Sequence, residues 1–434
     1  MKLLLIALIL LLASTAFAEE TPALKWGQTD AVIPYTAPGK LPIREEMPDL
    51  MTFEDGTPVV TAEDWQKRRA EIKALYEYYM YGYMPDGSEE TLTWAVDSNV
   101  LHITIARAGK EVTLKVPFVL PTGTAPEGGW PYYIEYSFWG MSDVVRYAAS
   151  RGYAGFAYSP YDVASDNSFF QGAFYTLYPR GIHATNRTGA LVAWAWGVSK
   201  IIDAMEQGAG EALGINPEYS LVGGVSRFGK SVAVAGAYDE RIKVVIPSCS
   251  GAGGIATYRT NNSGKTYDLT SLGGSSAWTN TSANEPLSNL QGGEGYWFCG
   301  RFAVIPSVEQ IPVDQHMLAA MVASPDRHMI IVTGITSEGW NNTEGQCLAY
   351  AASQPVWDLL GCPEQNNMII HLDGHAILQS DMQMILDYCD VHLFGKAPET
   401  VQTDLSQMKG NLFLNNNRDI LYPEFAPYLE RGIQ

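Results

Sequence analysis

Short apolar runs that alternate with helical patterns are the feature that most constrains this chain. The runs are bounded by Gly and Pro and lie at 111–120, 132–139, 153–159, 219–223, 243–247, 329–333 and 368–372. Between them lie patterns of helical periodicity, at 189–207, 230–238, 343–360 and 376–393. Apolar strands separated by helices are typical of parallel sheets that are buried on both faces. The sequence therefore predicts an α/β fold with a mostly parallel central sheet and helices on both faces.

The composition supports a large core and excludes two kinds of partner. Of the 434 residues, 46% are hydrophobic, 11% are aromatic and 17% are charged, so the chain is not disordered. Its length allows up to about three domains, or one elaborated α/β unit. Because 28 Lys and Arg oppose 47 Asp and Glu, the net charge is −19. Nucleic acids and anionic membranes attract clustered cations, so we expect neither as a partner.

Residues 1–18 are typical of a secretory signal peptide. Lys2 precedes an apolar run, and small residues end the segment at Ala18. The run is shorter than the roughly 20 residues that span a bilayer. We therefore expect a secreted or periplasmic protein without a membrane anchor after cleavage. The five cysteines are an odd number and too few for a disulfide framework in a chain of this length.

Three segments follow the expected cleavage site. Residues 19–60 are rich in Pro, Thr and Gly and lack periodicity, which indicates an N-terminal surface arm. An amphipathic helix at 61–83, with Thr61 as its N-cap, then opens a catalytic domain at 61–434. Within that domain, residues 250–307 are polar and rich in Gly, Asn, Ser and Thr. Long irregular stretches in compact domains are usually functional, so we expect this insertion to form part of the substrate site.

The sharpest local signal is YSLVGGVSRFGKS at 219–231, an apolar strand that runs through glycines into a helix. Residues 224–231 fit the pattern G-x-x-x-x-G-K-S, in which backbone N–H groups and a Lys hold nucleotide phosphates. They also fit a nucleophile elbow, which would expose the Ser226 hydroxyl above the sheet. The motif alone does not choose between these readings.

The surrounding sequence favours the elbow. A signal peptide sends the chain where ATP is scarce, and the next strand, KVVIP, ends without the Asp that would hold magnesium. Asp373, after a later strand, is the only residue that could take the place of this magnesium-binding Asp. A nucleophile elbow instead requires an acid and then a His, each after a later strand. The sequence supplies both.

His375 is the predicted general base. It directly follows the strand at 368–372 and precedes the last long helical pattern. An ordinary imidazole pKa near 6.5 allows it to take a proton and return it. His371, inside the strand, is expected to be structural, and His316 is a weaker candidate base. Because no HExxH or paired CxxC motif occurs, we expect no metal and no cofactor.

Glu338 is the predicted triad acid. The strand at 329–333 runs into TGITSEGWNNTEGQ, and Glu338 is the carboxylate closest to the strand end. Glu344 remains an alternative, although an acid at a helix start also suits the helix dipole. Asp373 is only two residues from His375, and neighbouring loop residues seldom face each other.

The run GVSRFGKSVAVAGAYDERI contains the elbow motif, and IPSCSGAGG follows it. This run resembles the elbow G-x-S-R-x-G-K of the glucuronoyl esterase family, carbohydrate esterase family 15. Further similar stretches are DGTPVVTAEDWQKRRAEI, WAWGVSKIID, NEPL with YWFC, PVDQHML and WNNTEG. The resemblance covers nearly all of the chain after the expected cleavage site.

This resemblance implies a single α/β-hydrolase domain that cleaves the ester between (4-O-methyl-)glucuronic acid of xylan and a lignin alcohol. By position, it implies Ser226 as nucleophile, His375 as base and Arg227 as a donor to the oxyanion. A developing oxyanion does require fixed donors. The resemblance also implies a substrate-binding set in which Lys and Glu bond sugar hydroxyls and Trp packs on the uronate: Lys230, Glu285 and Trp340.

Two departures from the family pattern bear on the site. Many members carry the triad acid 23 positions after the nucleophile, where this chain has Cys249. Some bacterial members share this pattern and take the acid from after a later strand, as Glu338 would be. The fungal members also join a Cys before the nucleophile to one after the His. Val225 and Ala376 occupy those places here, which excludes that disulfide.

We therefore predict a secreted serine esterase that forms a glucuronoyl-enzyme intermediate, with glucuronoxylan or lignin–carbohydrate esters as substrate. An esterase for acetyl or feruloyl groups on xylan is the alternative within the hydrolases. A catalytically silent carbohydrate-binding homologue, suggested by Cys249, is the alternative from another class.

Overall fold

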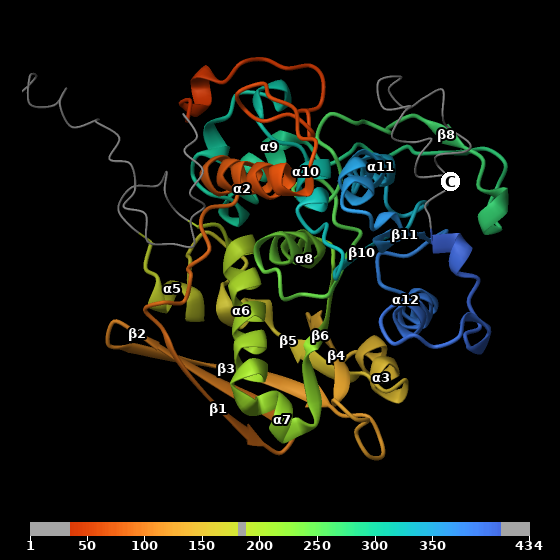
Figure 1. Ribbon diagram of the computed structural model, residues 1–434. Helices are drawn as coiled ribbons and strands as arrows, with labels where there is room; N and C mark the ends of the chain where they lie inside the picture. The colour runs from red at the N-terminus through yellow and green to blue at the C-terminus, as the bar shows by residue number, and fades with distance from the viewer. Residues whose placement is uncertain (1–34, 181–187, 409–434) are drawn as a thin grey trace, which may run out of the picture.

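The fold is built on one large sheet (Figure 1). The computed structural model describes residues 35–180 and 188–408. Within these residues, one sheet has the strand order β1-β2-β3-β5-β4-β6-β7-β10-β11. The strands from β5 onwards in this order run parallel, and β1 to β3 are antiparallel. Their bounds are Thr91–Asp97 (β1), Val100–Arg107 (β2), Lys110–Val119 (β3), Trp130–Tyr136 (β4), Ala154–Tyr158 (β5), Ile215–Val225 (β6), Val244–Ser248 (β7), His328–Thr333 (β10) and Asn366–Ile370 (β11).

The apolar runs in the sequence correctly identify the central strands but miss the edge. β5, β7 and β10 are buried along their whole length, which gives the continuous apolar runs of a covered parallel sheet. β1 and β2 alternate between more and less exposed positions, and polar side chains occupy many of the outer ones. Their sequences therefore lack an apolar run.

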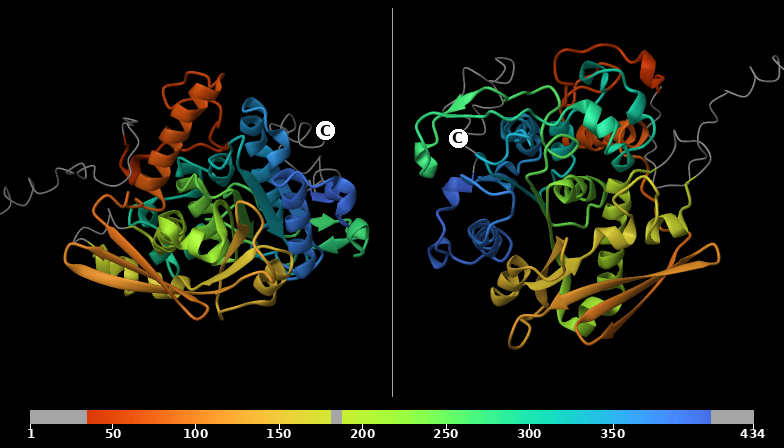
Figure 2. Two further views of the ribbon diagram at one scale, coloured as in Figure 1. Left: turned by 60° about the horizontal axis from the view of Figure 1, so that its bottom comes forward. Right: turned by 180° about the vertical axis from the view of Figure 1, so that it is seen from behind.

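Helices cover both faces of the sheet, as predicted (Figure 2). On one face, α3 (Asp143–Ser150) and α12 (Gln379–His392) share a core with alternate residues of the central strands. On the other face, α6 (Ala190–Ala204), α8 (Arg227–Tyr238) and α11 (Thr343–Leu359) belong to a larger core that α2 (Ala62–Tyr79) and α10 (Gln315–Ala320) extend. The shorter helices are α4 (Pro160–Val163), α5 (Ala173–Leu177), α7 (Gly210–Leu213) and α9 (Leu287–Gln291).

The predicted helices exist, but several of their ends differ. Thr61 is the N-cap of α2 as expected, because its hydroxyl accepts a hydrogen bond from the backbone N–H of Asp64 and the two residues form a capping box. α2 ends at Tyr79 rather than at 83. α12 starts at Gln379 rather than at 376, which leaves a longer loop after β11. That loop carries His375.

The described part of the expected N-terminal arm packs on the domain. The predicted signal peptide, 1–18, lies outside the described residues, and so does the first part of the arm. In the described part, 35–60, Tyr35 stacks on Tyr78 of α2 with ring centroids 3.9 Å apart, and the carbonyl of Leu41 accepts a hydrogen bond from Gln310 at 2.7 Å. Within the described residues, no helix has both the length and the apolar character needed to cross a membrane.

The polar segment 250–307 contains little regular structure beyond α9 and a small two-stranded sheet, β8 (Thr266–Tyr267) with β9 (Trp278–Thr279). Backbone hydrogen bonds attach it at two places. Cys299 N–H donates to the carbonyl of Met80 after α2 (2.8 Å), and Thr257 N–H donates to that of Gly345 in α11 (3.2 Å). In Figure 1 it runs across the end of the molecule that carries α2 and α11.

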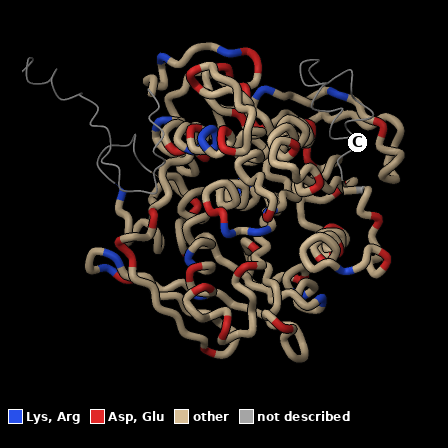
Figure 3. The backbone as a smooth tube through the Cα atoms, in the orientation of Figure 1, with Lys and Arg blue, Asp and Glu red and all other residues tan. Residues whose placement is uncertain are grey.

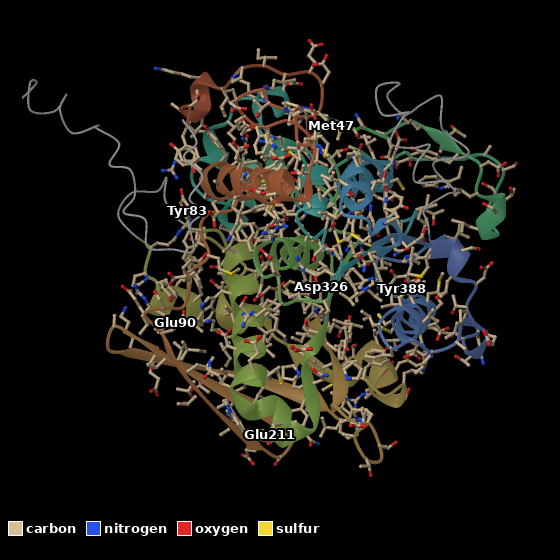
Figure 4. The ribbon with its side chains drawn as sticks, in the orientation of Figure 1. Met47, Tyr83, Glu90, Glu211, Asp326 and Tyr388 are labelled. Atoms are coloured by element: carbon tan, nitrogen blue, oxygen red, sulfur yellow. The ribbon has the colours of Figure 1, made fainter. Side chains whose placement is uncertain are left out.

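Acidic residues are spread over the whole fold, with Lys and Arg interspersed among them (Figure 3). One polar cavity of about 410 Å³ lies beside α6 and contains none of the predicted site residues. There Lys200 forms ion pairs with Glu90 (2.6 Å) and Asp203 (2.5 Å). Glu90 is labelled in Figure 4, in which side chains fill the space between the sheet and its helices. The charges of this cavity are thus largely paired within the protein.

Candidate active site

Ser226 occupies a sharp turn between β6 and α8. Its backbone has φ 62° and ψ −128°, in a region that non-glycine residues rarely adopt and that costs about 1–3 kcal/mol. A hydrogen bond from its N–H to the carbonyl of Ser248 at the end of β7 holds the turn (2.9 Å). Gly229 has to be glycine here, because a Cβ would collide with that same carbonyl. Ser226 is only partly buried, so this geometry has the form of a nucleophile elbow.

His375 and Glu338 meet in the loops that follow β11 and β10. The Nδ1 of His375 lies 2.8 Å from a Glu338 carboxylate oxygen. The Glu338 side chain is fully buried, whereas 45% of the His375 side chain is exposed. Asn341 donates its Nδ2–H to the second carboxylate oxygen at 2.5 Å. The carboxylate is thus fixed from one side and turned to the imidazole on the other.

Ser248 connects the turn of Ser226 to the loop of His375. Its carbonyl accepts from Ser226 N–H, and its hydroxyl donates to the carbonyl of Ala376 at 3.3 Å. The neighbouring backbone of Cys249 donates to the carbonyl of Val332 in β10 (2.8 Å). The ends of β6, β7, β10 and β11 therefore converge, which brings the hydroxyl and the imidazole to one edge of the sheet.

Cys249 lies beside the His–Glu pair as a buried thiol. The candidate ligand atoms of Cys249, Glu338 and His375 all lie within 4.8 Å of one another, and these are donor types that zinc accepts. Burial and the nearby Glu338 carboxylate raise the pKa of the Cys249 thiol to about 12. A neutral thiol is a poor metal ligand and cannot replace a carboxylate as partner of an imidazolium.

Arg227 follows Ser226 at the start of α8, and its guanidinium is held by Asp166. The Nη1 of Arg227 lies 2.5 Å from an Asp166 oxygen. The guanidinium also lies over the ring of Trp297, 5.2 Å from its centroid. Neither partner has a local sequence signal, since Asp166 precedes Arg227 by 61 positions. Sequence reasoning therefore missed both.

Lys230, one helical turn after Ser226, is buried in an ion pair with Glu285. Its Nζ lies 2.7 Å from Glu285, 2.8 Å from the carbonyl of Ser250 and 2.6 Å from that of Ala252. Both side chains of the pair are 3% exposed. The structure thus brings these two predicted substrate residues together, with all three ammonium hydrogens already used.

Trp340 and Glu294 complete this side of the site. The carbonyl of Trp340 accepts a hydrogen bond from the N–H of Glu285 (2.9 Å), and 44% of Trp340 is exposed. Burial and the charge of Glu285 raise the pKa of Glu294 to about 7. Asn289 joins the two acids through weak hydrogen bonds of 3.3 and 3.1 Å. Glu294 was not predicted from the sequence, where it stands between glycines without a recognisable motif.

Comparisons with known proteins decide the family. The family model described as glucuronyl esterase, fungi, matches residues 103–361. A 4-O-methyl-glucuronoyl methylesterase from Schizophyllum commune is 34% identical over 375 residues, which cover 86% of each chain. The chain belongs to the glucuronoyl esterase family.

Other members of the family are also similar. A multidomain esterase from Ruminococcus flavefaciens is 41% identical over 90% of this chain, which spans only 51% of that relative's length. The solved structure of a carbohydrate esterase family 15 glucuronoyl esterase from Caldicellulosiruptor kristjansonii is 38% identical, with a TM-score of 0.75 over 83% of this chain and 93% of that one. The glucuronoyl esterase catalytic domain from Hypocrea jecorina is 28% identical, with a TM-score of 0.68 over 88% and 98%. The expected α/β-hydrolase fold and the expectation of an esterase are confirmed.

In this member of the glucuronoyl esterase family, the alternative acid Glu344 and the alternative base His316 lie apart from His375. Glu344 is buried against Lys265 and the hydroxyl of Tyr267 rather than against His375. His316 is buried, its Nε2 bonds the carbonyl of Pro48 at 3.0 Å, and burial lowers its pKa to about 4. Geometry therefore separates these residues from the His375 site.

His371 and the cysteines have structural environments. The Nδ1 of His371 lies 2.9 Å from Asp381, and its Nε2 lies 2.9 Å from the carbonyl of Gly374, so the ring supports the loop that carries His375. All five cysteines are buried and free.

Proposed function

We propose that this chain hydrolyses the ester between (4-O-methyl-)glucuronic acid of xylan and a lignin alcohol. The observation that carries the proposal is the hydrogen bond between the Glu338 carboxylate and the Nδ1 of His375, beside the strained turn of Ser226. A carboxylate on Nδ1 keeps the proton there and leaves Nε2 free to accept one from a hydroxyl. The relatives' names, which include 4-O-methyl-glucuronoyl methylesterase, support the choice of ester.

In this mechanism, His375 Nε2 takes the proton of Ser226 as its oxygen attacks the ester carbonyl. Glu338 stabilises the imidazolium that forms. The carbonyl oxygen becomes an oxyanion that the backbone N–H and the guanidinium of Arg227 stabilise. The alcohol then leaves with the proton from His375, and a water molecule, deprotonated by the same ring, hydrolyses the glucuronoyl enzyme.

Lys230, Glu285 and Trp340 are the proposed sugar-binding residues. The exposed ring of Trp340 offers a face on which the uronate can pack. Since Lys230 already donates to Glu285 and to two carbonyls, a sugar hydroxyl must replace one of these acceptors or bond to Glu285 instead. The buried pair thus acts mainly by holding the Glu285 carboxylate in place. Segment 250–307, which supplies Glu285, forms part of the substrate site in this proposal.

The proposed organisation is a signal peptide at 1–18, a surface arm at 19–60 and a catalytic domain at 61–434, and we propose a secreted or periplasmic location. The apolar leader and the small residues before Glu19 support this location. The net charge of −19 argues against nucleic acids as partners.

Rapid-mixing kinetics with benzyl glucuronate tests the function. We expect a burst of benzyl alcohol that Ser226→Ala abolishes and that Ser380→Ala, a change at an exposed serine, leaves intact. Higher kcat/KM on acetylated xylan or methyl ferulate would favour the other esterases. Absence of any release of benzyl alcohol, with retained binding of glucuronoxylan, would favour a silent carbohydrate-binding homologue.

A further inference from the structure

Asp166 lies at the centre of a polar cluster beside the nucleophile. One carboxylate oxygen accepts from Arg227 Nη1 (2.5 Å) and the Tyr161 hydroxyl (3.1 Å). The other accepts from the Tyr296 hydroxyl (3.0 Å) and Trp297 Nε1 (2.8 Å). A carboxylate has about four lone-pair sites, so these four donors saturate it.

The donors come from separate parts of the chain. Tyr161 belongs to α4, Arg227 opens α8, and Tyr296 and Trp297 belong to segment 250–307. The loop that carries Asp166 is itself anchored, because Trp194 of α6 donates its Nε1–H to the carbonyl of Ala164 at 2.7 Å. The carboxylate is therefore fixed independently of Arg227, and only 15% of its side chain is exposed.

Among the described residues, Asp166 forms the ion pair of Arg227. The Arg227 side chain is 34% exposed, and a long exposed guanidinium samples many rotamers unless a partner selects one. Asp166 engages it through Nη1, while the Trp297 ring lies 5.2 Å from the guanidinium as a cation–π partner. Trp297 thus offers its N–H to Asp166 and its face to Arg227.

We propose that Asp166 is the positioning residue that holds the Arg227 guanidinium in the place where the ester oxyanion forms. This inference rests on the proposed function, in which Arg227 donates to the oxyanion. In this role Asp166 acts through Arg227, to which its carboxylate is bonded. Its loss leaves substrate binding largely intact but lets the donor move away from the transition state, so it lowers kcat rather than raising KM.

Asp166→Asn tests this role. In the variant, an N–H₂ group replaces one carboxylate oxygen and meets the two donors that this oxygen accepted. The cluster can then no longer hold Arg227 as before. We expect kcat on benzyl glucuronate to fall at least tenfold, up to the roughly 100- to 1,000-fold that follows loss of one oxyanion donor, with KM changed less than threefold. In an Arg227→Ala background, Asp166→Asn should lower kcat no further, because both changes remove the same interaction.

The matched control is Asp387→Asn, which breaks a second Asp–Arg pair. Asp387 lies 2.7 Å from Arg151, between α12 and α3. We expect a lower melting temperature from this change and an unaltered kcat. If Asp166→Asn does not fold, Asp166→Glu keeps the charge but shifts it by one methylene, and kcat should still fall.

The outcomes separate this inference from the proposed function. Unchanged kcat in a folded Asp166 variant, or an undiminished effect of Asp166→Asn in the Arg227→Ala background, would overturn the positioning role alone. An Arg227→Ala variant with unchanged kcat would instead overturn the proposed oxyanion role, and with it this inference.

Discussion

Replacement of Glu338 by Gln is the sharpest test of the proposed triad. Glu338 has two neighbours with defined roles: Asn341 donates an N–H to one oxygen, and the Nδ1 of His375 lies 2.8 Å from the other. A glutamine keeps the size of the side chain but turns one acceptor into a donor. The question is which of the two contacts the new N–H₂ takes.

The geometry favours the contact with His375. Because Asn341 donates, the glutamine oxygen has to face it, which directs the glutamine N–H₂ to the His375 Nδ1. That nitrogen must then be unprotonated to accept, and the proton moves to Nε2. A protonated Nε2 cannot take the proton of Ser226. Glu338→Gln therefore keeps the fold but selects the wrong tautomer.

The expected loss is large. In the serine-protease triad, the amide replacement of the acid lowers kcat by about 10⁴, which corresponds to about 5.5 kcal/mol at about 1.36 kcal/mol for each factor of ten. Here 45% of the His375 side chain is exposed, so water can contact the ring and offset part of the loss. We expect kcat to fall by about 10³- to 10⁴-fold.

Stopped-flow release of benzyl alcohol from benzyl glucuronate measures this loss, with the melting temperature as a check of folding. The matched control is Glu344→Gln, which disrupts a buried contact with Lys265 and Tyr267. This control should lower the melting temperature and leave kcat within about threefold, because Glu344 lies apart from the imidazole. The reasoning would be refuted if a folded Glu338→Gln variant retained more than a tenth of the wild-type kcat. It would also be refuted if Glu344→Gln lost more kcat than Glu338→Gln.

Two further predictions concern stability. Lys230→Met leaves the Glu285 carboxylate buried without its cation, so the free energy of unfolding in urea should fall by about 3–5 kcal/mol. The control Lys67→Met removes an exposed ion pair and should change that free energy little. An equal effect of the two changes would contradict the argument. His371 bonds two acceptors, so both ring nitrogens carry protons, and although burial opposes this charge, its hydrogen bond to Asp381 raises the pKa of His371. This contribution to stability is complete below the ordinary pKa of about 6.5 and is lost as the pH rises through the raised one. The wild-type melting temperature should fall over that interval more than that of His371→Gln, and parallel pH profiles would contradict the assignment.

The parts of the fold that the sequence predicts are those set by local patterns. Apolar runs define the parallel strands, and the glycines around Ser226 define the elbow because the turn leaves no space for a Cβ at Gly229. His375 is identifiable since it follows the last strand directly. Each of these signals lies within about ten residues of sequence.

The parts that the sequence does not predict depend on contacts between distant segments. The sequence favours Glu338 over Glu344 only by its place closest to the strand end. Its contact with His375 depends on how the loop after β10 folds, and the N–H of Thr336 fixes that loop by donating to the carbonyl of Leu372 (2.9 Å). The sequence does not predict the role of Asp166 either, because its partner Arg227 follows 61 residues later. No local sequence pattern indicates that a carboxylate pairs with a cation so far along the chain.

The sheet places Cys249 and the loop of Glu338 beside the same imidazole. β7 and β10 are parallel neighbours, with Ser248 paired to Val332, so Cys249 and the loop of Glu338 leave the sheet side by side. Both side chains reach the same imidazole, within 4.8 Å. Two carboxylates in this buried space would repel each other and raise one pKa, which would weaken the hold on the imidazolium. Burial and the nearby Glu338 carboxylate raise the pKa of the Cys249 thiol to about 12, so the thiol is neutral. It therefore occupies the position after β7 without repelling the Glu338 carboxylate. Cys249 is therefore compatible with Glu338 as the proposed triad acid.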